Sequence, residues 1–356
     1  MTLLHVVVPD GVDDPARPSG GNTYDRRLCS ELTALGWEVR EDAVQPENRC
    51  GETVFTASAV SEVLARVPRG CVVLLDGLVA SDQAEALRAE AARLRLVVLV
   101  HLPLGLGGPG GGGADVRARE AAALRCVDAV VTTSRWTRRW LLDAYGLDPS
   151  RVTVAVPGVE PAAAVTRDPG GRRLLCVGAV IAAKGHDVLL EALARVDGPG
   201  WVCTCVGSLE RDPAFVGRLR TRAVELGVAE QVQLTGALGG AALDAAYARA
   251  DLLVTASRGE TYGMAVTEAL ARGVPVLATR VGGLPEAVGH APGGRRPGIL
   301  VPPDDPGALA GALQQWLGDP GLRAHLRAAA EERRATLPTW SSTSEVVARV
   351  LTAVAG

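Results

Sequence analysis

Aromatic residues are scarce in this chain of 356 residues, because phenylalanine, tryptophan and tyrosine together make up only 3% of it. Aliphatic side chains and alanine must therefore fill the interior, since hydrophobic residues still account for 47% of the chain. An interior of valine, leucine and alanine suits parallel sheets, whose strands are buried on both faces by helices. The length exceeds that of one ordinary core of this kind and favours two domains.

The chain also lacks a strong charge of either sign, with a formal net charge of −3 and no long basic run. Nucleic-acid binding needs clustered lysine and arginine, so we expect no nucleic-acid partner. Of the 37 basic residues, all but Lys184 are arginine. This lone lysine is a candidate for a specific role.

Long hydrophobic runs are missing as well. No run reaches the about 18 apolar residues of a membrane span, and the run from Leu94 to Leu104 is interrupted three times. The segment from Met1 to Pro9 lacks a basic stretch and is typical of a first strand, not of a secretion signal. These patterns predict a cytoplasmic protein without a membrane span.

Cysteine provides no recognisable framework. The chain contains no Cys-x-x-Cys pair, and its seven cysteines are Cys29, Cys50, Cys71, Cys126, Cys176, Cys203 and Cys205. We interpret them as buried, reduced thiols, in preference to a metal site or a set of disulfides.

The first half of the chain alternates strand and helix patterns. A loop rich in glycine and proline follows the first expected strand, ends at Gly20-Gly21 and precedes a helix from about Thr23 to Leu35. This order is typical of the start of a Rossmann-like unit. Short apolar runs predict strands at Leu3–Val8, Val72–Asp76, Leu96–His101, Ala129–Ser134 and Val152–Val156.

The second half repeats the alternation after a stretch without periodicity. We expect a domain over residues 1–160, a linker over 161–171, a second domain over 172–338 and a last helix within 339–356. An apolar stripe in that helix suits packing back on the N-terminal domain. The strands expected in the second domain are Arg173–Val177, Trp201–Val206, Val232–Leu234, Leu252–Ala256, Pro275–Ala278 and Ile299–Val301.

A series of motifs in the second half carries a resemblance. Its parts are Val177-Gly178, Lys184-Gly185-His186, Glu260-Thr261-Tyr262-Gly263-Met264, Glu268-Ala269-Leu270 and Gly282-Gly283-Leu284-Pro285-Glu286. The set resembles the family-4 retaining glycosyltransferases, also called glycosyl transferases group 1. The hallmark of that family is a pair of glutamates separated by seven residues, here Glu260 and Glu268.

The resemblance implies a GT-B fold, in which two Rossmann-like, doubly wound parallel sheets face each other across a cleft. It implies transfer of a hexose from a nucleoside-diphosphate sugar to a small-molecule, glycan or natural-product acceptor. The expected mechanism is front-face substitution without a metal or another cofactor, with the nucleotide sugar as co-substrate. The base, the sugar and the hydroxyl acceptor stay open.

Each part of such a donor makes a separate demand. Lys184, before a predicted helix, suits the diphosphate, because helix N-termini also attract anions. Glu268, one turn inside a helix, suits the ribose hydroxyls, and Glu260, on a loop after a strand, suits the hexose. Backbone groups of Gly178 and of Tyr262-Gly263-Met264 are further donor contacts.

The N-terminal domain contributes Gly20, Gly21 and His101 as candidates. The glycine pair lacks the third glycine of a dinucleotide fingerprint, and we expect it to approach the donor phosphates. His101 ends a strand where such enzymes often carry an active-site histidine. We therefore predict His101, Lys184 and Glu260 as catalytic residues.

The sequence departs from the family pattern at Ala179, where many members have an arginine that contacts phosphate. Arg258 is a possible substitute. The adjacent carboxylates Asp13-Asp14 and Asp304-Asp305 suit solvated turns, and no Asp-x-Asp pair is placed to hold a metal.

Other enzyme classes remain open. A GT-B nucleotide-sugar epimerase or phosphorylase is one alternative, and an NAD-dependent oxidoreductase is another. The latter would need a Gly-x-Gly-x-x-Gly directly after the first strand, which the chain lacks. A non-catalytic sugar-binding protein is disfavoured by the intact set of Lys184, Glu260 and Glu268.

Overall fold

The computed structural model describes residues 2–14, 18–49, 52–107, 113–163, 168–198 and 200–356. It divides into two compact units. Unit 1 comprises Met1–Asp13, Ser19–Gly158 and Pro338–Gly356, and unit 2 comprises Asp14–Pro18 and Val159–Leu337. Cys50 and the glycine-rich residues 108–112 lie outside the described residues. Among those that are described, no helix is long and apolar enough to cross a membrane.

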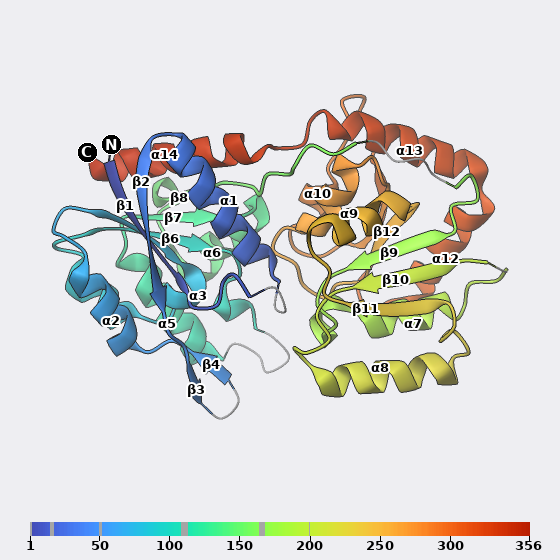
Figure 1. Ribbon diagram of the computed structural model, residues 1–356, viewed down its shortest axis with the longest axis horizontal. Coiled ribbons are helices and arrows are strands. Elements are labelled where there is room, and N and C mark those ends of the chain that lie inside the picture. The colour runs from blue at the N-terminus through green and yellow to red at the C-terminus, as the bar shows by residue number, and fades with distance from the viewer. Residues whose placement is uncertain (1, 15–17, 50–51, 108–112, 164–167, 199) are drawn as a thin grey trace. The chain divides into compact units, whose positions relative to one another are not determined.

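Unit 1 is built on a sheet of six parallel strands in the order β2-β1-β5-β6-β7-β8 (Figure 1). The central strands β5 and β6 are apolar along almost their whole length, as expected for strands covered on both faces. Their bounds are β1 (Thr2–Pro9), β2 (Trp37–Val44), β5 (Val72–Asp76), β6 (Arg95–Val100), β7 (Ala129–Thr132) and β8 (Val152–Val154). The predicted strands of this half are confirmed.

Helices connect these strands in the manner of a Rossmann-like unit. They are α1 (Gly20–Ala34), α2 (Ala57–Arg66), α3 (Gly77–Ala80), α4 (Ala84–Glu90), α5 (Ala114–Arg125) and α6 (Arg135–Tyr145). A small hairpin of β3 (Glu47–Arg49) and β4 (Glu52–Val54) precedes α2. The elements expected from the sequence included neither the hairpin nor α2, although Val60, Val63, Leu64 and Val67 repeat at helical spacing.

The helix predicted from about Thr23 is confirmed but begins earlier, at Gly20, so the prediction that a loop ends at Gly20-Gly21 is wrong. The Ser19 hydroxyl accepts a hydrogen bond from the Asn22 backbone N–H at 3.1 Å, and α1 therefore begins at Gly20. Such an N-cap satisfies one of the free N–H groups of the first turn. The side chain of Asn22 also donates to the Val12 carbonyl at 2.9 Å, which fixes the preceding loop to the helix.

The last helix, α14 (Trp340–Ala355), packs against α1 within unit 1 (Figure 1). The ring of Trp340 meets that of Tyr24 edge-on at 5.4 Å between centroids. Thr343 donates its hydroxyl to the Val156 carbonyl at 2.7 Å. A Cβ added to Gly158 would lie 2.2 Å from the Trp340 backbone nitrogen, so the backbones approach here as only glycine allows.

Unit 2 contains a second sheet of six parallel strands, in the order β11-β10-β9-β12-β13-β14. Their bounds are β9 (Arg173–Val177), β10 (Val202–Val206), β11 (Val232–Gly236), β12 (Leu252–Thr255), β13 (Val276–Thr279) and β14 (Gly298–Val301). The helices are α7 (His186–Leu193), α8 (Pro213–Glu225), α9 (Gly240–Arg249), α10 (Met264–Ala271), α11 (Leu284–Val288), α12 (Pro306–Gly318) and α13 (Pro320–Arg334). The alternation predicted for this half is confirmed.

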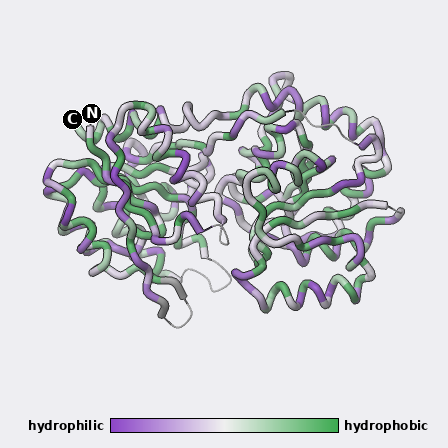
Figure 2. The backbone as a smooth tube through the Cα atoms, viewed as in Figure 1, coloured by the Kyte–Doolittle hydropathy of each residue, from purple (hydrophilic) through white to green (hydrophobic). Residues whose placement is uncertain are grey.

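The sheet of unit 2 is covered on one face by α7, α8 and α12, where the largest part of its core lies. Figure 2 shows hydrophobic colour along the central strands and mixed colour along the outer helices. The few aromatic residues are used centrally: Trp316 is fully buried, and its Nε1–H donates to the Gly171 carbonyl at 2.7 Å. Aliphatic residues supply most of the remaining core, as the composition predicts.

Candidate active site

The strand order of unit 2 defines where a ligand can bind. The first strand, β9, lies between β10 and β12. The strands that follow β9 are added first on one side of it, as β10 and β11, and then on the other side, as β12, β13 and β14. The place beside β9 where the order reverses is the switch point of the sheet. Ligands of open parallel sheets bind at the carboxyl ends of strands at such a switch point. Gly178 and Lys184 follow β9, and the segment from Arg258 to Met264 follows β12. The fold therefore gathers most of the predicted donor residues at one sheet edge.

Lys184 and Glu260 form an ion pair at this edge. The Nζ group donates to Oε2 of Glu260 at 2.5 Å, and their side chains are 30% and 19% exposed. A Cβ at Gly178 would lie 3.6 Å from Cδ of Lys184, an ordinary van der Waals distance, so the aliphatic part of the lysine packs beside this glycine. An anionic ligand arriving from solvent would compete with Glu260 for the ammonium group.

A tight turn holds Lys184 in place. The residue ends the 3-10 turn Ala182–Lys184, and Gly185 follows with φ +67°. A Cβ at Gly185 would lie 2.0 Å from the Ala256 carbonyl oxygen, so only glycine permits this contact. The Arg258 N–H also donates to the Ala183 carbonyl at 2.9 Å. The loops after β9 and β12 are thus joined directly.

Arg258, predicted as a phosphate contact, is engaged with protein groups. Its guanidinium binds the Asp187 carboxylate in a bidentate manner at 2.8 and 2.9 Å, and Nε donates to Asp304 at 2.7 Å. It also donates to the carbonyl of Ala182. These bonds let Arg258 brace the turn that carries Lys184, and a phosphate contact stays a prediction.

The glycine pair Gly282-Gly283 fixes the backbone of Glu260. The Gly283 N–H donates to the Glu260 carbonyl at 2.8 Å. A Cβ on Gly282 would lie 1.8 Å from that same oxygen, and one on Gly283 would lie 2.2 Å from the Thr261 carbonyl oxygen. The glycine pair Gly282-Gly283 therefore holds the backbone of Glu260 in position.

Two helices begin at the switch point without a side-chain cap. They are α7, which starts after Gly185, and α10, which starts after Gly263 at φ 106°. Uncapped N-termini present backbone N–H groups and the positive end of the helix dipole, which attract phosphate. Tyr262 is buried, and burial raises the pKa of its phenol, so it packs as a neutral side chain. Met264 is the first residue of α10.

Glu268, on α10, is held by a tyrosine that sequence reasoning missed. The Tyr247 hydroxyl, from α9, donates to Oε2 of Glu268 at 2.6 Å. Burial raises the pKa of Glu268 above its usual value, and the bond from Tyr247 works against that rise. Arg272 stacks on the Tyr247 ring, with 4.7 Å from its guanidinium carbon to the centroid. Only the packing of α9 on α10 brings these residues together.

A second polar cluster lies in unit 1, at the carboxyl ends of its strands. His101 follows β6, and its Nε2 lies 2.9 Å from Oδ1 of Asp25 and 3.9 Å from Oδ2 of Asp76. A Cβ at Gly21 would lie 3.3 Å from the His101 ring, so the glycine lets α1 approach the histidine. The ring of Tyr24 contacts His101 edge-on. Sequence reasoning missed both aspartates, because neither belongs to a motif.

The two carboxylates decide the charge of His101. Burial alone would lower its pKa, but the charge and hydrogen bond of Asp25, with Asp76, raise it to about 9 from 6.5. Burial and the nearby Asp25 raise the pKa of Asp76 to about 7. At neutral pH the imidazole is therefore protonated and donates hydrogen bonds. It is unsuited to the role of general base.

We expect this cluster to make stability fall at alkaline pH. A histidine whose folded pKa exceeds 6.5 stabilises the fold below that pH, and the gain is lost as pH rises through about 9. Asp76, whose pKa is raised to about 7, still titrates at the lower end of this range and is ionised above about pH 8, so the change at higher pH belongs to His101. Between pH 7 and 9.5, the melting temperature of the wild type should fall by about 2 °C more than that of Asp25→Asn, measured by differential scanning fluorimetry.

The matched control is Asp82→Asn, which removes a carboxylate of unit 1 that pairs with Arg119 instead. It should keep the wild-type slope against pH. If the melting temperatures of the wild type and Asp25→Asn depend on pH in the same way, Asp25 does not raise the pKa of His101.

The described residues include two separate groups of three metal-ligating side chains, and within each group the ligand atoms lie within 4.8 Å of one another. One is Asp25, Asp76 and His101, whose groups already bond one another and the start of α3. The other is Cys176, His186 and Cys205, in the core of unit 2. The described cysteines are free thiols; four of them are buried, as predicted, whereas Cys71 and Cys126 are half-buried. The grouping of Cys176, His186 and Cys205 was not expected from the sequence.

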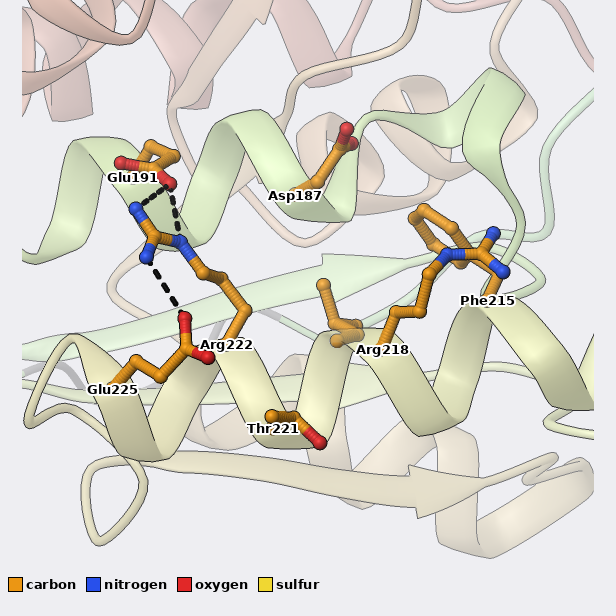
Figure 3. A pocket seen from close by; sticks show the side chains of 8 residues that line it. Asp187, Glu191, Phe215, Arg218, Thr221, Arg222 and Glu225 are labelled. Carbon is orange, nitrogen blue, oxygen red and sulfur yellow. Dashed lines mark hydrogen bonds and ion pairs between the residues drawn. The ribbon is translucent and has the colours of Figure 1, made fainter.

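A hollow on the surface of unit 2 lies between α7 and α8 (Figure 3). Three of its charges pair with one another: Arg222 pairs with Glu191 on α7 and with Glu225 on α8. The other residues that line it are Asp187, Phe215, Arg218, Leu219 and Thr221. We therefore place the candidate site at the switch point and not in this hollow.

Known proteins match this chain along both halves. The family model of Glycosyl transferases group 1 matches residues 162–333, and that of Glycosyltransferase Family 4 matches residues 78–163. A D-inositol 3-phosphate glycosyltransferase of Jonesia denitrificans is 32% identical over 346 residues, covering 90% of this chain and 80% of the relative. One of Thermobispora bispora is 35% identical over 251 residues, covering 65% of this chain and 58% of the relative.

Solved structures show the fold. Sucrose-phosphate synthase of Thermosynechococcus elongatus matches with a TM-score of 0.82 at 21% identity, over 99% of both chains. Anabaena HepE in complex with UDP-glucose matches with a TM-score of 0.79 at 16% identity, over 99% of this chain and all of that one. The prediction of a two-domain, Rossmann-like GT-B fold is confirmed.

Proposed function

Because the chain belongs to the family of glycosyl transferases group 1 and is a glycosyltransferase, we propose that it transfers a hexose from a nucleoside-diphosphate sugar to a hydroxyl acceptor, with retention of configuration. The observation that carries the proposal is the Lys184–Glu260 pair between two uncapped helix N-termini at the switch point of unit 2. Cationic and N–H groups on one side and a carboxylate on the other suit a ligand with a diphosphate and sugar hydroxyls.

In this proposal the diphosphate takes the place that Glu260 now holds on Lys184. The N–H groups at the starts of α7 and α10 add donors that are fixed in the fold and need no rearrangement. Gly178 and Gly263 are proposed as backbone contacts of the donor, and Gly263 takes φ 106°, which glycine adopts without strain. Released from Lys184, the Glu260 carboxylate can accept hydrogen bonds from the hexose.

Glu268 binds the two ribose hydroxyls in the same proposal. A carboxylate can accept both, and the bond from Tyr247 sets its orientation. The side chain projects from the second turn of α10 toward the helix start, as helical side chains do. Donor base and sugar stay open, so a nucleotide panel must identify them.

The proposed chemistry requires no protein nucleophile. The bond from the anomeric carbon to the leaving phosphate oxygen breaks, and the bond to the acceptor oxygen forms on the same face of the sugar. The acceptor proton passes to the phosphate oxygen that leaves. Lys184 and the helix N-termini stabilise the negative charge that develops on this diphosphate. His101, protonated in unit 1, serves as a hydrogen-bond donor to the substrate.

The relatives suggest which acceptors to test first. Those of Jonesia denitrificans and Thermobispora bispora are named for D-inositol 3-phosphate, so inositol phosphates lead the panel and simple sugar phosphates follow. Each of UDP-, GDP-, ADP- and dTDP-sugars should be incubated with each acceptor, and nucleoside diphosphate release and product should both be measured. Proton NMR of the product should show the anomeric configuration of the donor. An inverted product would overturn the retaining mechanism, and epimerised donor without acceptor would favour an epimerase.

We expect transfer to survive excess EDTA. No Asp-x-Asp pair accompanies the proposed diphosphate site, where Lys184 and helix N-termini supply the positive charge instead. Initial rates with and without EDTA should agree within about twofold. A loss of activity that magnesium or manganese restores would contradict this expectation.

Three further expectations complete the proposal. The enzyme works without a resident cofactor at this site, in the cytoplasm, and without a nucleic-acid partner. Gly20 and Gly21 contribute to substrate binding from the first turn of α1, where Gly21 already adjoins His101.

A further inference from the structure

Three cysteines and a histidine converge inside unit 2. Cys176 on β9 and Cys205 on β10 are paired across the parallel ladder, so their side chains lie on the same face of the sheet. Cys203 precedes Cys205 by two residues and shares that face. His186, the first residue of α7, reaches this face from the helix that covers it. Two strands and a helix thus bring four soft or borderline donor atoms together.

The spacing of these atoms fits a metal site. Nε2 of His186 lies 3.7 Å from Sγ of Cys176, and Sγ of Cys203 lies 4.0 Å from Sγ of Cys205. The ligand atoms of Cys176, His186 and Cys205 all lie within 4.8 Å of one another. Around tetrahedral zinc, with bonds of about 2.0–2.3 Å, neighbouring ligand atoms stand roughly 3.5–3.8 Å apart. Small side-chain movements would close this group of three on an ion, whereas Cys203, which adjoins Cys205 but lies outside the group, would need a larger movement to become the fourth ligand.

Burial leaves the histidine of this cluster poorly satisfied. All four side chains belong to residues that are at most 3% exposed. Within the described structure, Nδ1 of His186 is buried without a hydrogen-bond partner, so the weak contact of Nε2 with sulfur is the polar interaction that orients the ring. A buried polar side chain so poorly satisfied costs about 1–3 kcal/mol. A metal–imidazole bond would offset that cost.

We propose that Cys176, Cys203, Cys205 and His186 bind one zinc ion inside unit 2. Thiolate and imidazole ligands select zinc over magnesium or manganese, which prefer oxygen. Four protein ligands in a closed, buried site indicate a structural ion and not a catalytic one. Burial also disfavours a redox switch, because such thiols are shielded from oxidants in solution.

The ion would stabilise the strands and the helix start that carry the switch point. It would tie β9 to β10 and both strands to the start of α7, two residues after Lys184. This inference concerns the core of unit 2 and does not depend on the proposed transfer reaction. It also differs from the EDTA expectation, since magnesium cannot replace a thiolate-bound zinc ion.

The first test measures metal in the wild-type protein purified from zinc-supplemented medium without a metal-affinity tag. Inductively coupled plasma mass spectrometry should find about one zinc per chain. X-ray absorption at the zinc edge should show mainly sulfur ligands with one nitrogen. Less than about 0.1 zinc per chain, or a shell of oxygen ligands, would overturn the proposal, as would a disulfide among these cysteines in the intact mass of the unreduced protein.

A second test uses cobalt and a matched pair of variants. Cobalt substituted into the wild type should give a thiolate-to-metal charge-transfer band and the visible bands of tetrahedral coordination. Cys205→Ser should lose most of the zinc and this spectrum, whereas Cys29→Ser, a buried cysteine of unit 1, should keep both. If Cys205→Ser fails to fold, the wild-type spectrum alone decides, because its absence would contradict the site.

Discussion

Replacing Lys184 by alanine is expected to lower kcat/KM for sugar transfer by about 100-fold or more, the scale of losing a charged group that stabilises a transition state. Lys184 is the only lysine of the chain, and its Nζ lies at the switch point of unit 2, next to Glu260. Negative charge grows on the departing diphosphate, so the effect should fall mainly on kcat. Steady-state kinetics with the cognate donor measure it.

The ion pair with Glu260 offers a second explanation for a loss of activity in Lys184→Ala, and the experiment must distinguish it from a role of Lys184 in catalysis. Lys184→Ala leaves that carboxylate unpaired, which could disturb the loop without any role in catalysis. A purely structural role would lower the melting temperature along with the activity, whereas a role in catalysis leaves the melting temperature of Lys184→Ala within about 2 °C of the wild type. Arg222→Ala, which breaks ion pairs away from the switch point, is the control. A loss of activity in Lys184→Ala that is matched by a large fall in melting temperature would assign Lys184 a structural role only.

Glu268→Ala should also cost about 100-fold in kcat/KM, but chiefly through weaker binding of the nucleotide. The carboxylate is the proposed partner of the ribose hydroxyls, so isothermal titration with the nucleoside diphosphate should register the loss directly. Glu268→Gln keeps the shape but not the charge, and its affinity should lie between those of the wild type and the alanine variant.

Tyr247→Phe tests how Glu268 is oriented. This variant removes only the hydroxyl that donates to Glu268, so a loss of about tenfold in nucleotide affinity is expected, smaller than that of Glu268→Ala. Glu225→Ala, an exposed glutamate of α8, should bind nucleotide like the wild type. A folded Glu268→Ala variant with unchanged nucleotide affinity would remove Glu268 from the site.

Much of this fold could be predicted from the sequence, because buried parallel strands are short apolar runs. Each half shows five or six of them with helices between, and the structure places them in two sheets. The ends of helices were harder to predict where a capping side chain, and not the apolar pattern, decides where the helix begins. Ser19 starts α1 at Gly20, although the apolar pattern begins only later. The hairpin of β3 and β4 carries too few apolar residues to predict.

The candidate site was predictable only where residues sit in motifs. Lys184, Glu260 and Glu268 lie in conspicuous sequence segments, and the fold brings the first two into contact. Tyr247, Asp25 and Asp76 have no such signal, because helix packing or strand order alone sets their positions. The partners of Arg258 likewise depend on the tertiary fold. The four proposed zinc ligands are scattered in the sequence, and they lie near one another only because of the register of β9 and β10 and the packing of α7 on these strands.

Nucleotide binding by wild-type protein and by Glu268→Ala tests the central claim most directly. Isothermal titration with UDP, GDP, ADP and dTDP should show one nucleoside diphosphate that binds the wild type at least about tenfold more tightly than the others. The same nucleotide should bind Glu268→Ala at least about tenfold more weakly, while both proteins melt at similar temperatures. Equal binding of all four nucleotides, or of none, by the folded wild type would contradict a nucleotide-sugar site at the switch point of unit 2.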